Sequence, residues 1–229
     1  MSSVISVVQD PEVFKAGTRV PEIAAIGTLQ WRLFLAIAPM QAFITSTTLV
    51  AIAEMGDKTQ LLSFVLAARL RKPWPIIAGI LVATLANHAL AGWAGSLLAG
   101  LVPEAPLIWI VGLSFIAFGL WALHPDALDG SPAVLKSGVF VTSLVAFFLA
   151  EIGDKTQLAT VALAARFDAL AQVIAGTTLG MMIANVPAVW IGDRLAQRIP
   201  MQAVRLIAAA LFIVVGVFTL WSTSVSPWR

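Results

Sequence analysis

Long, mostly apolar runs dominate this chain of 229 residues and determine what it can fold into. Only 11% of the residues are charged, against roughly 25% in an ordinary soluble domain, and 59% are hydrophobic. A helix needs about 20 mostly apolar residues to cross the hydrocarbon core of a bilayer. The sequence therefore predicts an all-α integral membrane protein with six transmembrane helices. The six runs cover residues 40–68, 74–100, 106–123, 138–166, 169–192 and 203–222.

Composition also excludes several classes of function. The chain has no cysteine, so it has no disulfide, no thiolate nucleophile and no cysteine-based metal site. Its formal net charge of +2 is too small to indicate nucleic-acid binding as its main activity. The expected environment is the lipid bilayer.

The runs and the polar stretches between them divide the chain into five parts. Residues 1–30 form an N-terminal tail without the pattern of a cleaved signal peptide. Residues 31–123 and 137–224 each contain three of the six runs, and the polar, proline-containing stretch 124–136 links them. Residues 225–229 form a C-terminal tail.

The two three-span parts are copies of one another. Segments 43–69 and 140–166, which are 97 residues apart, are identical at 15 of 27 positions without a gap. The identical core is the block A-E-x-G-D-K-T-Q-L, at 53–61 and again at 150–158. Chance similarity between apolar segments does not produce a block this rich in charge, so we interpret it as an internal repeat.

An odd number of spans in each copy reverses the direction in which the second copy enters the membrane. This arrangement is an inverted-topology repeat, which many secondary transporters use to build a site near the middle of the bilayer. The motif of the second copy lies about 15–20 Å from either end of its run, at a rise of about 1.5 Å per residue. We therefore expect both motifs near the midplane.

Charged side chains near the midplane of the bilayer are energetically unfavourable and need an explanation. An Asp, Glu or Lys at the centre of a membrane helix costs about 2.5–3.5 kcal/mol. A structural alternative is an intrahelical ion pair, since Glu54–Lys58 and Glu151–Lys155 have the favourable i,i+4 spacing. That alternative leaves Asp57 and Asp154 unpaired, so we favour a functional interpretation.

The spacing of the acidic residues predicts a cation site. The Glu and the Asp of each motif are three residues apart and share a helix face, and inverted symmetry can bring the two faces together. Four carboxylates and two lysines leave a formal charge of −2, and oxygen donors suit Mn²⁺, Ca²⁺ or Mg²⁺. The predicted cation ligands are Glu54, Asp57, Glu151 and Asp154. Supporting side-chain oxygens come from Thr59, Gln60, Thr156 and Gln157, and charge compensation comes from Lys58 and Lys155.

A glycine separates the two acidic residues of each motif. Gly56 and Gly153 each cost about 1 kcal/mol inside a helix, so we expect local unwinding, a hinge, or a close approach of another helix there. These alternatives are compatible.

Three further polar residues lie in the second and fifth runs. Asn87, His88 and Asn185 either line the path of the cation or form interhelical hydrogen bonds. His88 is a candidate proton carrier, but it has no histidine counterpart in the other copy, and we favour a hydrogen-bonded core histidine. We expect the glycines of the second run, Gly79, Gly92, Gly95 and Gly100, to form a helix-packing surface.

Two copies of E-x-G-D-K-T, at 54–59 and 151–156, resemble the motifs of one known family. It is the family of cation exchangers that includes Golgi manganese/calcium transporters, chloroplast manganese transporters and bacterial manganese exporters. The resemblance covers about residues 40–222 and implies transport of Mn²⁺ or Ca²⁺ in exchange for protons, with Glu54, Asp57, Glu151 and Asp154 as ligands. The cation is then a transported substrate and not a permanently bound cofactor. The compact chain further suggests a bacterial plasma membrane.

Crowded carboxylates suit exchange, because they cannot all stay ionised in a medium of low dielectric constant once the cation has left. We therefore expect export of a divalent cation as protons enter. Seven basic residues lie near the span ends on one side and five on the other, which predicts both termini on the non-cytoplasmic side. The alternatives are a passive cation channel, an amino-acid exporter, and an intramembrane aspartyl protease that uses Asp57 and Asp154.

Overall fold

The structure, a computed structural model, describes residues 38–124, 135–191 and 201–224. The chain divides into two units, Met1–Ala38 and Pro39–Arg229, and the fold described here is that of the second unit. The predicted N-terminal tail 1–30, the C-terminal tail 225–229 and most of the linker 124–136 lie outside the described residues.

The elements of the described part are all helices. The first covers residues 38–54. It is followed by α4 (Lys58–Leu70), α5 (Pro73–Leu101), α6 (Glu104–Ala122), α7 (Val139–Glu151), α8 (Lys155–Arg166), α9 (Leu170–Ile191) and α11 (Met201–Ser224).

Four of the predicted runs form one helix each, and the two runs that carry the motifs are each divided in two. The helix 38–54 and α4 together make the first run, and α7 and α8 make the fourth. Within residues 38–124, 135–191 and 201–224, three helices are long and apolar enough to cross a membrane: α5, α6 and residues Leu170–Trp190 of α9. The prediction of an all-helical membrane protein is confirmed at this level, and the six-span inverted repeat stays a prediction.

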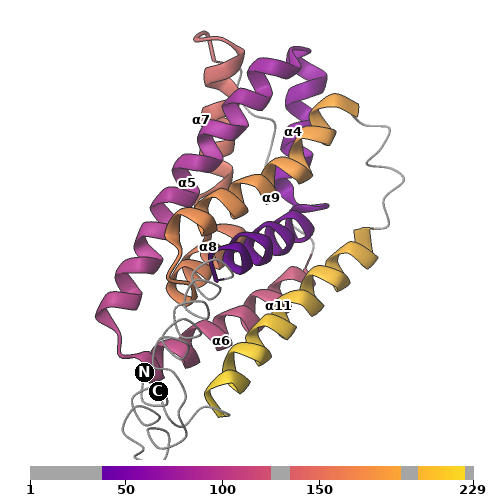
Figure 1. Cartoon of the computed structure of the whole chain (residues 1–229). Coiled ribbons are helices and arrows are strands. Elements are labelled where there is room, and N and C mark those ends of the chain that lie inside the picture. The colour runs from indigo at the N-terminus through magenta and orange to yellow at the C-terminus, as the bar shows by residue number, and fades with distance from the viewer. Residues whose placement is uncertain (1–37, 125–134, 192–200, 225–229) are drawn as a thin grey trace, which may run out of the picture. The chain divides into compact units, whose positions relative to one another are not determined.

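Glycines allow α5 to lie against α7 and α8, as Figure 1 shows for α5 and α7. A Cβ on Gly79 would lie 2.8 Å from both the Phe140 carbonyl oxygen and the Ser143 Cβ. A Cβ on Gly95 would overlap the Val161 carbonyl oxygen of α8. The helix backbones can therefore approach closely only where the side chain is a hydrogen atom.

The predicted packing role holds for three of the four glycines of α5. Gly92 faces Leu170 and Ile174 of α9, where a Cβ would lie 3.0 Å from each side chain. The prediction for Gly100 is wrong, because no heavy atom lies within 4 Å of the position its Cβ would take. Gly100 lies one residue before the end of α5, beyond the segment that packs on α8 and α9.

The same kind of contact recurs between α9 and the helix 38–54. A Cβ on Gly176 would lie 2.6 Å from the Phe43 carbonyl oxygen and 3.0 Å from the Ser46 Cβ. Gly176 follows Gly79 by 97 positions, and Phe43 and Ser46 precede by 97 positions the two residues that Gly79 contacts. The long helix of each copy thus packs on the motif-bearing segment of the other copy.

The helices α6 and α11 lie side by side and pack through glycines and aromatic rings (Figure 1). Gly216 of α11 approaches Gly112 of α6, whose carbonyl oxygen would lie 2.7 Å from an added Cβ. The rings of Phe115 and Phe212 stack with centroids 6.3 Å apart, and both side chains are buried. Outward-facing tryptophans such as Trp109 and Trp221 are exposed, as expected for surfaces that face lipid or its interface.

Candidate cation site

Both motifs interrupt the helix that carries them. The helix 38–54 ends at Glu54 and α4 begins at Lys58, while α7 ends at Glu151 and α8 begins at Lys155. Between them Gly56 has a φ of 81° and Gly153 a φ of 75°, values that favour glycine. No heavy atom lies within 4 Å of the Cβ position of Gly153, so local unwinding, and not close helix packing, explains this glycine.

The two glutamines complete the interruptions. Gly56 donates its N–H to Gln60 Oε1 at 2.8 Å, and Gly153 donates its N–H to Gln157 Oε1 at 2.7 Å. Gln60 also donates Nε2–H to the Ala184 carbonyl oxygen at 3.0 Å, which ties α4 to α9. In this structure the glutamine oxygens therefore bind backbone N–H groups that the broken helices leave unpaired.

Three of the four predicted carboxylates come together. Oxygens of Glu54, Asp57 and Asp154 lie within 4.8 Å of one another, and the residues are 0%, 2% and 1% exposed. Two of these residues come from the first copy of the motif and one from the second. We call these three residues the acidic cluster.

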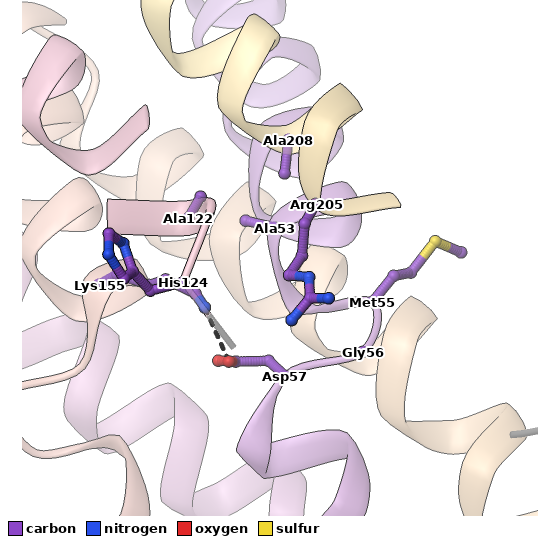
Figure 2. A pocket seen from close by; sticks show the side chains of 9 residues that line it. All are labelled: Ala53, Met55, Gly56, Asp57, Ala122, His124, Lys155, Arg205 and Ala208. Atoms are coloured by element: carbon purple, nitrogen blue, oxygen red, sulfur yellow. Dashed lines mark hydrogen bonds and ion pairs between the residues drawn. The ribbon is translucent and has the colours of Figure 1, made fainter. Parts of the chain in front are cut away.

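Each lysine pairs with the aspartate of the other copy. Lys155 Nζ lies 2.7 Å from Asp57 Oδ1, as Figure 2 shows, and Lys58 Nζ lies 2.9 Å from Asp154 Oδ1. The lysines differ in exposure, since the Lys155 side chain is 5% exposed and the Lys58 side chain 25%. These ion pairs join the two copies across the centre of the fold.

The two glutamates have different surroundings. Thr59 donates its hydroxyl to Glu54 Oε2, and Glu54 Oε1 has no hydrogen-bond partner among the described residues. Glu151 accepts from Thr84 Oγ1 at 2.6 Å and from Asn87 Nδ2 at 3.1 Å, both on α5. Glu151 lies outside the acidic cluster in this structure, and its carboxylate is held by α5.

Thr84 is a residue that the sequence analysis missed. It is a buried hydroxyl in the middle of an apolar run, one helical turn before His88. Its position near Asn87 in an apolar run is the sequence signal that could have identified Thr84 as a site residue. Thr156 donates to Asp154 Oδ2 at 3.1 Å and so braces the cluster from the second copy.

Some polar side chains of α5 and α9 have hydrogen-bond partners among the described residues, and others have none. Asn185 accepts from Ser63 Oγ at 2.8 Å and donates to the Met181 carbonyl oxygen at 3.0 Å. His88 is fully buried, and neither ring nitrogen has a hydrogen-bond partner in the part of the chain that the structure describes. The described residues therefore do not supply the hydrogen bonds expected for a core histidine, because packing buries the ring where they offer no polar partner.

A small pocket reaches the Asp57–Lys155 ion pair (Figure 2). Its lining also includes Met55, His124 and Arg205, and its volume of about 10 Å³ is close to that needed by a single water molecule. The buried ion pair therefore lines a space about large enough for a single water molecule.

Comparison with known proteins gives the family. The sequence model of the divalent cation/proton antiporter GDT1 matches the chain twice, over residues 42–130 and 139–226. This chain belongs to the GDT1 family. The two matches coincide with the two halves of the internal repeat, and each contains one motif.

Individual relatives agree with this assignment. A Vibrio cholerae protein named "Putative manganese exporter" is 51% identical over 181 residues, which cover 79% of this chain and 90% of that protein. A GDT1-like protein of Synechocystis is 31% identical over 205 residues, covering 80% of this chain and 98% of that protein. GDT1-like protein 4 of Oryza sativa subsp. indica is 28% identical over 199 residues, covering 75% and 70%. No solved structure matches the chain.

Family membership confirms that the chain is a transporter and not an enzyme. The alternative of an intramembrane aspartyl protease is thereby set aside. The predicted transport of a divalent cation in exchange for protons is the activity of the family.

Proposed function

We propose that this GDT1-family transporter exports Mn²⁺ from a bacterial cytoplasm across the plasma membrane in exchange for protons, through a site shared by its two halves. The observation that carries the proposal is the acidic cluster of Glu54, Asp57 and Asp154, buried and drawn from both motifs. Buried carboxylates need a counter-charge, and the two lysines supply only part of it. Oxygen donors of this kind suit a hard divalent cation.

The lysines act as internal counter-ions when no cation is bound. Lys58 and Lys155 each pair with an aspartate of the opposite half, so the two aspartates are neutralised in this structure. An arriving cation displaces these ammonium groups and takes the Asp57 and Asp154 oxygens together with the Glu54 Oε1 atom, which has no described hydrogen-bond partner. When the cation leaves, the crowded carboxylates take up protons or return to the lysines.

Glu151 completes the set of ligands in our proposal. In this structure Thr84 and Asn87 hold it. The positions 97 residues further on are Met181 and Ala184, which have no hydroxyl or amide side chain to hold Glu54 in the same way. We infer that Glu151 binds the cation only after its carboxylate has left Thr84 and Asn87, so that Glu54 and Glu151 join the site at different steps.

The architecture that suits this exchange is the inverted repeat of three spans and three spans, with residues 31–123 and 137–224 as its halves, between the tails 1–30 and 225–229. The reciprocal glycine contacts of α5 and α9 support it, as does the double match to the family. Rocking of one half against the other then exposes the site to each side of the membrane in turn. The excess of basic residues near the span ends favours both termini on the non-cytoplasmic side.

The choice of Mn²⁺ rests on the relative from Vibrio cholerae and its name. Ca²⁺ takes a similar oxygen shell, so it is the main competing substrate. A bacterium that lacks its own manganese exporter provides the test. The wild-type chain should restore growth in excess Mn²⁺, and Asp57→Asn or Asp154→Asn should abolish the rescue.

Glu104→Gln is the matched control, because Glu104 is an exposed acidic residue at the start of α6 and lies outside the acidic cluster. It should rescue growth as well as the wild type. Rescue by both aspartate variants at normal protein levels would refute the shared site. In proteoliposomes, a Mn²⁺ flux that an imposed pH gradient cannot drive uphill would identify a passive channel instead of an exchanger.

A further inference from the structure

His88 is a buried polar side chain to which the exchange described above gives no role. The side chain is 0% exposed, and both Nδ1 and Nε2 are without a hydrogen-bond partner among the described residues. A neutral imidazole has one donor and one acceptor nitrogen. Burying such groups unsatisfied is unfavourable, so the ring is expected to bind something that the described chain does not supply.

The contacts of α5 place His88 level with the interruption between α7 and α8. Before it along α5, Gly79 packs on Ser143 of α7, and Asn87 donates to Glu151 at the end of α7. After it, Gly95 packs on Val161 of α8. Because α5 follows α7 and then α8 in the same direction, the residue immediately after Asn87 is at the level of the break at residues 152–154, whose last residue belongs to the acidic cluster. His88 follows Thr84, which also donates to Glu151, by four residues, so it shares the helix face that Thr84 turns to α7.

The corresponding position in the other half shows what an ordinary structural residue does there. Asn185 follows His88 by 97 residues, and its amide is bonded to Ser63 and to the Met181 carbonyl oxygen. The counterpart of Ser63 is Thr160, whose hydroxyl donates to the Thr156 carbonyl oxygen of its own helix at 2.8 Å. The two halves therefore differ at this position. One half has an amide with hydrogen-bond partners, and the other has an imidazole without a described partner.

We propose that His88 supplies a nitrogen ligand to the cation as it passes the interruption between α7 and α8, and that it selects transition-metal ions over Ca²⁺ and Mg²⁺. Imidazole nitrogen is a common ligand of transition metals, whereas Ca²⁺ and Mg²⁺ take oxygen ligands almost exclusively. This inference rests on the proposed exchange at the acidic cluster and deepens its specificity. It makes the selectivity a property of one half of the repeat.

Transport by the full-length chain in proteoliposomes tests this selectivity, with Mn²⁺ and Ca²⁺ measured separately. The variants are His88→Asn, which introduces the residue of the other half, and His88→Gln. Both should lower the ratio of Mn²⁺ to Ca²⁺ transport by about tenfold, the lower end of the effect expected from disturbing a metal's protein ligands. His124→Asn is the comparison variant, because it removes the other histidine of the chain, which lines the pocket at the Asp57–Lys155 ion pair. A fall of the ratio in His124→Asn but in neither His88 variant would assign the selectivity to that pocket and overturn the inference.

Pulsed electron paramagnetic resonance of Mn²⁺ bound to the purified full chain gives a readout that does not depend on transport. With ¹⁵N-labelled histidine, the wild type and His124→Asn should show a nitrogen hyperfine coupling, and His88→Asn should lose it. Absence of the coupling from the wild type, or its loss only in His124→Asn, overturns the inference. If no divalent cation is transported by the wild type, the proposed function fails, whereas an unchanged Mn²⁺ to Ca²⁺ ratio in both His88 variants refutes only the selectivity.

Discussion

At the scale of single residues, the exchange of partners between the two motifs is the main feature of the site. A lysine four residues after a glutamate could have paired within its own helix, yet Lys155 lies 2.7 Å from Asp57, which is 98 residues away. The unwound turn after each glutamate directs the aspartate and the following lysine away from the helix that precedes them. The motif thus links the two halves instead of stabilising a single helix.

Replacing Lys155 with methionine should destabilise the protein strongly. The variant leaves the Asp57 carboxylate buried without its ammonium partner, and breaking one side of a buried ion pair costs about 3–5 kcal/mol. Lys58→Met should cost less, because the Lys58 side chain is 25% exposed. Thermal unfolding of the detergent-purified protein measures both, and adding Asp57→Asn to Lys155→Met should recover most of the loss. Equal losses for the two lysine variants would contradict the difference in burial.

Replacing Gly153 with alanine should destabilise the turn without a steric clash. The Cβ enters open space, but a φ of 75° costs an L-residue about 1–2 kcal/mol. The same measurement of thermal unfolding tests this, together with cation transport. A variant as stable as the wild type would mean that the turn relaxes to a negative φ.

At the scale of the helices, glycines determine which segments can touch. The long helices α5 and α9 each lie against a motif-bearing segment of the opposite half, and in both cases a glycine faces a backbone carbonyl oxygen. Their hydrophobic residues alone do not specify this arrangement, because lipid is as apolar as another helix. Close backbone approach supplies the specificity.

Gly176→Ala should therefore separate α9 from the helix 38–54 and reduce both stability and transport. Its Cβ would lie 2.6 Å from the Phe43 carbonyl oxygen, and backbone cannot move aside as a side chain can. The expected loss is about 1–3 kcal/mol, as for overpacking in a core. Gly100→Ala is the matched control on α5, since its Cβ meets nothing within 4 Å and alanine is favoured over glycine in a helix by about 1 kcal/mol. Similar losses in the two variants would argue against the close approach.

At the scale of the whole molecule, the helices from α4 to α11 contact the opposite half more than their own half. The helices α7 and α8 pack on α5, and α9 packs on α4, so the motif-bearing segments find their neighbours mainly in the other copy. The ion pairs of Lys58 with Asp154 and of Lys155 with Asp57 cross the same boundary.

Neither half should transport a cation when it is produced alone, and the two halves produced together should recover transport. Fragments 1–130 and 131–229 divide the chain within the linker that separates the two family matches in sequence. The growth assay with excess Mn²⁺ measures the recovery. Rescue by a single fragment would show that one motif suffices, although a symmetric pair of identical fragments would then need to be excluded by cross-linking.

The sequence by itself determined the helical membrane class, the repeat and the residues that bear charge within the apolar runs. Those conclusions depend on local properties, namely hydrophobic run length, insertion cost and the identity of the two motif blocks. They also sufficed for the resemblance to the family that the comparison confirmed.

Only the tertiary structure decided which carboxylates lie together, which lysine each aspartate binds, and which polar residues stay unbonded. The sequence placed Glu151 with the other three acids and His88 among the hydrogen-bonded residues, whereas in the structure α5 holds Glu151 and His88 has no described partner. Such partners are set by how two copies of similar sequence pack on each other at long range. Spacing along the chain fixes the face on which a side chain lies, and only packing fixes what faces it.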